Sequence, residues 1–261
     1  MDTSIIEHAW RTSFQIVVYK GNSIQDDSII SFGSGFYLSY NNNVYFITAD
    51  HVLHYDDYIE GKRLNQDYHV AIVTNIADKG KYESIYVPTS GFYCIDRFDS
   101  QCPELPDFID IMFAKASDKI TCPFLTDKLL DDSCNEIVNA GLEKFIIPAS
   151  NISDVSNNKK YIITGWCLQD ISTMIVKRKN AIWCDLEYQE TKIGEDIILK
   201  SPVSVKYSAW KSLSGSPVFN YSKKLIGMLV EVNDNDDTLT VIPIHKILKF
   251  IDLCSKVKPS I

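Results

Sequence analysis

The sequence predicts an all-β protein, and two observations carry this prediction. Short apolar runs recur along most of the chain, separated by turn residues, and they do not alternate with long helical segments. The chain also contains 12 Phe, 4 Trp and 14 Tyr but only 11 Gly, and aromatic side chains are enriched in strands. Strands of this length and spacing are typical of an antiparallel barrel or sandwich.

A short helix is predicted at the start, because Ser4 and Glu7 have the spacing of a capping box, and this helix should end near Trp10. Strand-like runs follow, and turn residues such as Gly21-Asn22 and Asn41-Asn42-Asn43 separate them. The strand-like runs of the first half are residues 14–19, 29–40, 44–53, 68–74, 84–87 and 108–115.

The strand pattern weakens between residues 119 and 158, where residues 135–145 are helix-like. This stretch is the predicted connection between two domains, residues 1–130 and residues 131–261. Strand-like runs resume at residues 161–167, 173–177, 182–188, 196–199, 217–219, 225–232 and 239–243. The chain closes with apolar residues at helical spacing, namely Ile244, Ile247, Leu248, Ile251 and Cys254. They predict an amphipathic C-terminal helix that docks on the β structure.

The size and charge of the chain limit the class of protein and the kinds of binding partner that we expect. With 261 residues, 45% of them hydrophobic and 23% charged, it has the balance of an ordinary globular protein and can bury a core without a metal or disulfide. Lys and Arg number 26 against 34 Asp and Glu, which gives a net charge of −8. Binding to nucleic acid or to an anionic membrane surface needs clustered basic residues, so neither is an expected partner.

The seven cysteines point to a reducing compartment. Their number is odd, no C-x-x-C occurs and no Cys/His group has zinc-finger spacing, so neither a disulfide framework nor a bound metal is expected. The thiols are predicted to be small core residues. The acidic run 233–237 lacks the Gly and distal Glu of a calcium loop and predicts a hairpin turn. The start of the chain does not resemble a signal peptide and no apolar run is long enough for a membrane helix, so we expect a cytoplasmic protein.

Three short segments carry residues that together suggest a catalytic chemistry. The first is Gly33-Ser34-Gly35-Phe36 followed by Thr48-Ala49-Asp50-His51, the second is Asp110-Ile111-Met112-Phe113-Ala114-Lys115, and the third is Ser212-Leu213-Ser214-Gly215-Ser216-Pro217. In this order they resemble the motifs of the chymotrypsin/trypsin-like serine peptidases, especially the compact bacterial members without disulfides. The resemblance covers about residues 30–245. It implies two antiparallel six-stranded β-barrels, the first carrying His and Asp and the second carrying Ser, with the catalytic site between them.

The resemblance assigns a role to each member of a Ser-His-Asp triad. Ser214 would be the nucleophile, His51 the base that takes its proton, and Asp110 the carboxylate that orients the imidazole. Such a site hydrolyses peptide bonds through an acyl-enzyme intermediate and needs no metal or cofactor. His54 and Asp107 are the nearest rivals of His51 and Asp110, but neither fits the motifs.

The backbone N–H groups of Ser212, Leu213 and Ser214 are expected to form the oxyanion hole. The family usually has Gly where this sequence has Ser212, and a serine is strained there if the position needs a positive φ. The alternative to a peptidase is therefore a pseudopeptidase that binds peptides with a disabled oxyanion hole, and a third interpretation is an esterase-like hydrolase. We also hypothesise that Ser212 belongs to a gate opened by an activating partner protein.

Substrate selection is predicted from the same resemblance. Ser208, six residues before the nucleophile, would lie at the bottom of the specificity pocket, and a small neutral residue there does not favour cleavage after Lys or Arg. Val230, Glu231 and Val232 are expected to line the groove, where an extended protein or peptide substrate could pair as an added strand. The sequence makes no prediction of the oligomeric state.

Overall fold

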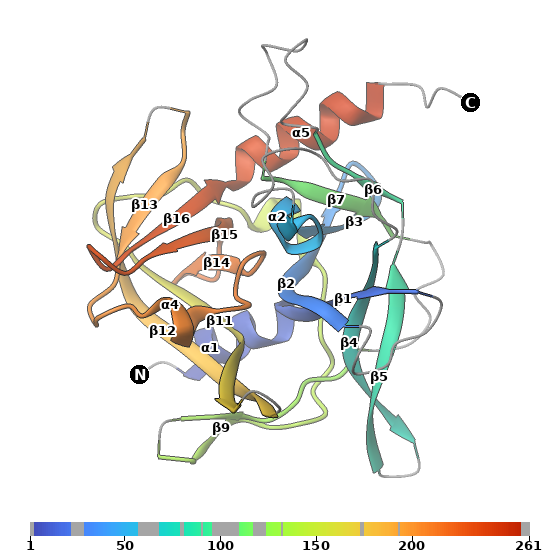
Figure 1. Cartoon of the computed structure of the whole chain (residues 1–261). Coiled ribbons are helices and arrows are strands. Elements are labelled where there is room, and N and C mark those ends of the chain that lie inside the picture. The colour runs from blue at the N-terminus through green and yellow to red at the C-terminus, as the bar shows by residue number, and fades with distance from the viewer. Residues whose placement is uncertain are drawn as a thin grey trace.

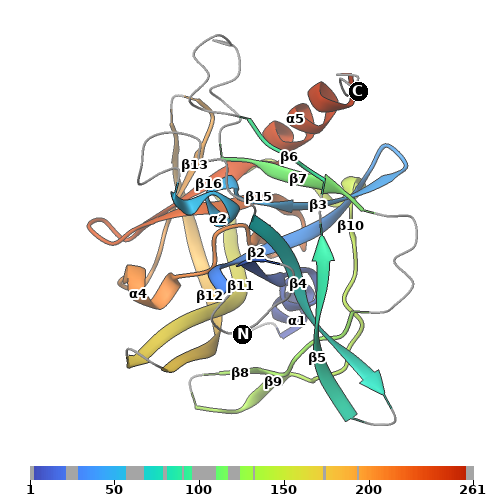
Figure 2. The same ribbon diagram turned by 45° about the vertical axis from the view of Figure 1, so that its right-hand side comes forward.

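The computed structural model describes residues 3–21, 29–56, 68–78, 81–89, 91–95, 110–116, 124–131, 133–172, 175–192 and 194–256, with only the backbone described for residues 75–78, 81–86, 169–172 and 175–180. Two β-units lie side by side, and the C-terminal helix runs across both of them (Figures 1 and 2). The strands of the first unit come almost entirely from the first half of the chain, and those of the second unit come from the second half.

The first unit is an eight-stranded sheet in the order β5-β4-β1-β2-β3-β7-β6, with β10 paired in parallel to β2. Its strands are β1 (Phe14–Lys20), β2 (Ile29–Tyr40), β3 (Asn43–Thr48), β4 (Tyr68–Asp78), β5 (Lys81–Thr89), β6 (Phe92–Tyr93), β7 (Met112–Lys115) and β10 (Ile147–Pro148). Within the described residues this sheet stays open, because its end strands β5 and β6 each pair with one neighbour and β6 has only 2 residues. The predicted pair of six-stranded barrels is therefore supported in part, because the described strands of the first unit form an open sheet and not a closed barrel.

The second unit is a closed barrel in the order β11-β12-β13-β16-β15-β14, which confirms the six-stranded barrel predicted for the C-terminal half. Its strands are β11 (Lys160–Ser172), β12 (Ile175–Thr191), β13 (Ile197–Lys200), β14 (Pro217–Asn220), β15 (Leu225–Asn233) and β16 (Thr238–Pro243). Alternate side chains fill the interior, and Ile163, Leu186 and Leu229 are fully buried there. The register of β15 shifts between Leu229 and Glu231, and such bulges re-aim side chains next to functional sites.

The described helices are α1 (Thr3–Thr12), α2 (Asp50–Leu53), the 3-10 turn η3 (Ala149–Asn151), α4 (Tyr207–Trp210) and α5 (Ile244–Lys256). The helices predicted at the two ends of the chain are confirmed, although Ser4 lies inside α1 instead of capping it. None of the described helices combines the length and the apolar character needed to cross a lipid bilayer.

Helix α5 holds the two units together (Figure 2). Tyr40 of the first unit donates a hydrogen bond from its hydroxyl to Asp252 of the helix (2.8 Å). The buried Lys246 of the same helix donates to Asp196, next to β13 of the second unit (2.9 Å). Because the apolar face of the helix is buried at the same time, α5 sets how the two units lie relative to each other.

The prediction of a helix over residues 135–145 is wrong. The chain there forms β9 (Glu136–Val138), which pairs with β8 (Leu129–Leu130). The Asp131 carboxylate accepts a hydrogen bond from the Asn135 N–H (2.8 Å) and starts the turn between these strands. Residues 135–145 pair with residues 124–130 instead, and such contacts between segments override a weak local preference for helix.

Every cysteine in the described residues is a free thiol, as the sequence predicts. The buried or half-buried ones are Cys167, Cys184 and Cys254, and Cys102 and Cys122 lie outside the described residues. Cys94 and Cys134 are exposed, so the predicted core position is wrong for these two. Cys94 follows the short edge strand β6. Cys134 lies in the turn before β9 and has a φ of 63°. Neither position is shielded from solvent.

His8 gives α1 a pH-dependent contact with the rest of the protein. Its ring lies 5.0 Å from those of Phe145 and Phe219, measured between centroids, and its Nε2 is buried without a hydrogen-bond partner in the described structure. Burial, helped by the charges of Lys223 and Arg11, lowers the pKa of His8 to about 4. The folded protein therefore favours the neutral imidazole.

We expect the free energy of unfolding to fall by about 1–2 kcal/mol between pH 7 and pH 4 because of His8, a figure reduced for solvent screening of the partly exposed ring. The unfolded chain takes up this proton near the ordinary pKa of 6.5, whereas the folded chain resists it until about 4, so acid favours unfolding across that window. In urea unfolding measured at several pH values, His8→Phe should lose this part of the pH dependence. His245→Gln, at an exposed histidine, should keep it. An unchanged pH dependence in His8→Phe would contradict the prediction.

Candidate active site

The segment that carries His51 follows the end of β3 directly. The strand predicted over residues 44–53 ends at Thr48, and the chain continues as the helical turn α2. The Thr48 hydroxyl donates to the Ser34 carbonyl of β2 (2.7 Å) and fixes the end of the strand. The His54 backbone N–H donates to the Asp50 carbonyl and closes the turn (2.9 Å). These bonds hold His51 at the edge of the first sheet.

His51 and Asp110 lie in direct contact. Nδ1 of His51 is 2.9 Å from Oδ2 and 3.0 Å from Oδ1 of Asp110, and the backbone N–H of His51 donates to Oδ1 (3.1 Å). The antiparallel register of β3 and β7 pairs Thr48 with Met112, so the residues just after β3 and just before β7 meet at one end of the sheet. The side chains of His51 and Asp110 are 28% and 23% exposed, so the pair is partly open to solvent.

The pKa of His51 reflects this contact. Burial alone would lower the pKa of His51, but the charge of the Asp110 carboxylate and the hydrogen bond that the ring donates to it raise that pKa. The negative charges of Asp50 and Glu231 also raise it. The net result is a pKa above the ordinary histidine value. A carboxylate that stabilises the imidazolium strengthens a histidine that must take a proton from a neutral hydroxyl.

Ser214 lies in the loop before β14, and the backbone of this loop is bonded to the first unit. The Ser34 N–H donates to the Ser214 carbonyl (2.9 Å), and the Gly215 N–H donates to the Leu229 carbonyl of β15 (2.8 Å). Gly215 has a φ of 91°, and a Cβ added to it would lie 1.9 Å from the Ser34 carbonyl oxygen. Only glycine permits this approach. The first and third sequence motifs therefore meet at Ser34.

The hydroxyl of Ser214 has a weak partner. The side chain is half-buried, and Oγ donates to the Val230 carbonyl over 3.3 Å. Rotation about χ1 would release so long a contact at small cost. Ser34 connects this serine to the histidine, because its N–H bonds to Ser214 while its carbonyl accepts from Thr48, three residues before His51.

Ser212 adopts a φ of 80°, in the left-handed region that favours glycine. Two hydrogen bonds hold it there, from the Ser34 hydroxyl to the Ser212 carbonyl (3.0 Å) and from the Leu168 N–H to the Lys211 carbonyl (3.3 Å). Since the peptide is trans, the Ser212 N–H points away from Leu168. Within the described residues, the N–H groups of Ser212 and Ser214 donate to no protein acceptor, which leaves both available to an oxyanion.

The other predicted site residues differ in their accessibility. The Leu213 N–H donates to the Trp210 carbonyl (3.3 Å), so it is already in use. Ser208 is exposed in α4, and its part in specificity stays a prediction. Residues 230–232 lie beyond Met228, the last residue of β15 that pairs with β14, so among the described residues this edge has no strand partner.

Two hydroxyl residues that build the site, Ser34 and Thr48, received no role from the sequence. Both lie within segments that the motifs single out, and both are buried, at 1% and 0% exposure. A buried hydroxyl requires a hydrogen-bond partner: the Thr48 hydroxyl finds it within the first unit, at the Ser34 carbonyl, and the Ser34 hydroxyl finds it across the junction, at the Ser212 carbonyl of the second unit. The available signal was a polar side chain at an otherwise apolar strand position, but the sequence does not say which distant loop supplies its partner.

Comparison with known proteins finds similarity only among solved structures. No protein-family model matches the sequence, and no curated protein matches it. The chain is similar to a serine endoprotease from Yersinia pestis, at 10% identity and a TM-score of 0.48, over 97% of this chain and 67% of that one. It is also similar to the MamO protease domain from Magnetospirillum magneticum in its apo form, at 12% identity and a TM-score of 0.44, over 90% of this chain and 94% of that one. A third is a protease from M. tuberculosis in its active form, at 10% identity and a TM-score of 0.47, over 99% of this chain and 87% of that one.

Proposed function

We propose that this chain is a serine endopeptidase that hydrolyses peptide bonds of protein or peptide substrates. The observation that carries the proposal is the two-oxygen contact of Asp110 with Nδ1 of His51, at the junction where the Ser214 loop is bonded to the first sheet. Hydrogen bonding of Nδ1 to a carboxylate fixes the tautomer that leaves Nε2 as a base. The raised pKa of His51 supports the same assignment.

In the proposed mechanism, Oγ of Ser214 attacks the scissile carbonyl while Nε2 of His51 takes the hydroxyl proton. General-base help of this kind contributes about 10²–10⁴ in rate. The N–H groups of Ser212 and Ser214 would stabilise the negative oxygen of the tetrahedral intermediate, and each such donor is worth roughly 10²–10³ in kcat. The imidazolium then gives its proton to the leaving amine. Water attacks the resulting ester of Ser214 by the same route and restores the enzyme.

The substrate would bind along β15 as an extended strand. Residues 230–232 offer an edge without a strand partner in the described structure, and the carbonyl of Val230 already faces Ser214. Glu231 is exposed, and it is close enough to His51 to affect the pKa of His51, so this edge of β15 is negative near the site. We therefore expect basic residues in the substrate to favour binding beside the scissile bond.

The second candidate is a pseudopeptidase that binds peptides without cutting them, and the conformation of Ser212 favours it. A non-glycine residue at a φ of 80° carries strain of about 1–3 kcal/mol. If the Lys211–Ser212 peptide reversed to relieve that strain, the hole would lose one donor. The bonds from Ser34 and Leu168 oppose that reversal, which favours the peptidase.

Labelling with a fluorophosphonate probe tests both candidates. For a peptidase, the wild-type chain should be labelled on Ser214, and labelling should be lost in Ser214→Ala and in His51→Ala. Ser222→Ala, at an exposed serine in the turn after β14, should be labelled like the wild type. Ser212→Gly removes the backbone strain. The probe should label this variant at the wild-type rate or up to about tenfold faster. Labelling of Ser212→Gly but not of the wild type would establish the pseudopeptidase, and no labelling of either folded protein would overturn the peptidase.

A further inference from the structure

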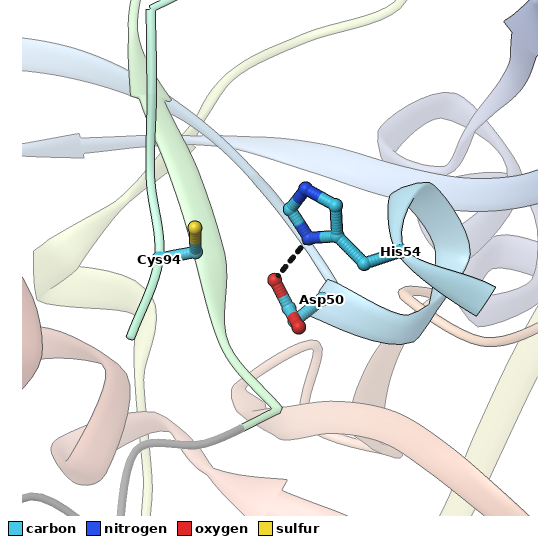
Figure 3. Close-up of side chains that lie close together, drawn as sticks. All are labelled: Asp50, His54 and Cys94. Carbon is cyan, nitrogen blue, oxygen red and sulfur yellow. Dashed lines mark hydrogen bonds and ion pairs between the residues drawn. The ribbon is translucent and has the colours of Figure 1, made fainter. Parts of the chain in front are cut away.

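A second cluster of reactive side chains lies beside the candidate active site. Asp50 and His54 are four residues apart at α2, the helical turn that carries His51, and Cys94 follows strand β6 (Figure 3). Nδ1 of His54 lies 2.8 Å from Oδ1 of Asp50, and one ligand atom from each of the three residues lies within 4.8 Å of the other two. The cluster therefore joins two segments that are about forty residues apart in the sequence.

We propose that Asp50, His54 and Cys94 form a Zn²⁺ site. A carboxylate oxygen, an imidazole nitrogen and a thiolate sulfur are the three donor types that zinc uses in proteins. Bond lengths of about 2.0–2.3 Å to a tetrahedral ion place its ligand atoms about 3.5 Å apart. The ligand atoms of the cluster lie within 4.8 Å of one another, and the 2.8 Å hydrogen bond between Asp50 and His54 would be exchanged for bonds from both to the ion. Cys94 is exposed beyond a strand of only 2 residues, which makes it the ligand that can move.

Asp50 and His54 place the cluster at partial depth. The Asp50 side chain is 1% exposed and that of His54 is 19% exposed, so an ion between them would be largely shielded from water, which strengthens its attraction to the carboxylate. A Zn²⁺ ion bound to one carboxylate, one thiolate and one neutral imidazole gives a site with no net charge. Three protein ligands leave the fourth position of the ion to water.

The site would fasten together the two parts of the first unit that present His51 and Asp110. α2 and the residue that caps its end supply Asp50 and His54, and β6 leads to Cys94. β6 pairs with β7 through Phe92 and Tyr93, and β7 begins directly after the Asp110 segment. Bound metal would therefore restrain the helical turn against this edge of the sheet. The inference does not depend on the proposed hydrolysis, because it rests on a different set of side chains.

Titration of the chelator-treated protein, residues 1–261, with Co²⁺ tests the proposal. We expect one Co²⁺ to bind per chain, with the near-ultraviolet thiolate-to-cobalt absorption that only a cysteine ligand produces, and Zn²⁺ should displace it. Cys94→Ser should lose this absorption, and His54→Gln should bind at least tenfold more weakly. Cys134→Ser removes another exposed thiol and should behave like the wild type.

Thermal unfolding provides a readout that is independent of the absorption. Zn²⁺ at a hundredfold excess over its Kd should raise the Tm of the wild type and of Cys134→Ser by roughly 5–10 °C, and should leave Cys94→Ser unchanged. The proposal is overturned if the absorption persists in Cys94→Ser, if the wild type gives no thiolate band, or if Zn²⁺ stabilises Cys94→Ser equally. Fluorophosphonate labelling tests the proposed peptidase and does not bear on the zinc site. Each of these two proposals can therefore fail without the other.

Discussion

Asp110→Asn is expected to lower kcat for peptide hydrolysis by about 10⁴-fold, with a much smaller change in KM. Both carboxylate oxygens of Asp110 lie within 3.0 Å of Nδ1 of His51, so at present the ring can only donate from that nitrogen. An asparagine amide can present its own N–H to Nδ1 and thereby stabilise the opposite tautomer, whose Nε2 carries a proton and cannot act as a base. The variant keeps the shape of the side chain and removes its charge.

The measurement is steady-state hydrolysis of a fluorogenic peptide, with circular dichroism to verify that the variant is folded. Asp234→Asn, in the exposed turn between β15 and β16, removes the same charge away from the site and should leave kcat within twofold. A loss smaller than tenfold in folded Asp110→Asn would mean that Asp110 does not orient the histidine, and the proposed mechanism would then lose its central contact.

The features that sequence patterns predicted well are those with a local cause. The spacing of the apolar residues from Ile244 onward has a helical period, and α5 follows it over Ile244–Lys256. Other strands of the second barrel likewise follow short apolar runs between turn residues, but the runs 173–177 and 182–188 were wrongly predicted as two strands, because β12 is one strand over Ile175–Thr191. The order of the three motifs predicted that His51 and Asp110 would lie together, and they are in contact. Their catalytic roles stay a prediction.

The features that were missed depend on contacts between distant segments. Residues 135–145 have a helix-like pattern, but pairing of β9 with β8 outweighs it. Strand β6 has only 2 residues and gives almost no periodic signal, so the open edge of the first sheet could not be foreseen. Cys94 lies near Asp50 and His54 only because the sheet brings β6 to α2, and a rule based on ligand spacing along the sequence cannot detect such a group.

Gly215→Ala should be the most disruptive small substitution in the candidate site. We expect it to lower the free energy of unfolding by roughly 2–5 kcal/mol, because it combines overpacking with an unfavourable positive φ. The added Cβ would lie 1.9 Å from the Ser34 carbonyl oxygen and 2.7 Å from Oγ1 of Thr48. Both of these atoms belong to the bonded junction between the units, so neither can move away without breaking a hydrogen bond.

Gly21→Ala is the matched control, because Gly21 has nearly the same φ, 92°, but a Cβ there would meet none of the described residues within 4 Å. Urea unfolding of the two variants separates backbone strain, which both carry, from the steric clash, which only Gly215→Ala carries. Peptide hydrolysis should fall by at least about 10²-fold in Gly215→Ala, since displacement of the loop by about 1 Å misplaces the neighbouring Ser214. Equal destabilisation of both variants would show that the loop does not need its close approach to Ser34. A larger effect at Gly215 would mean that one backbone contact between the units positions the nucleophile relative to the histidine, because Ser34 bonds to both segments.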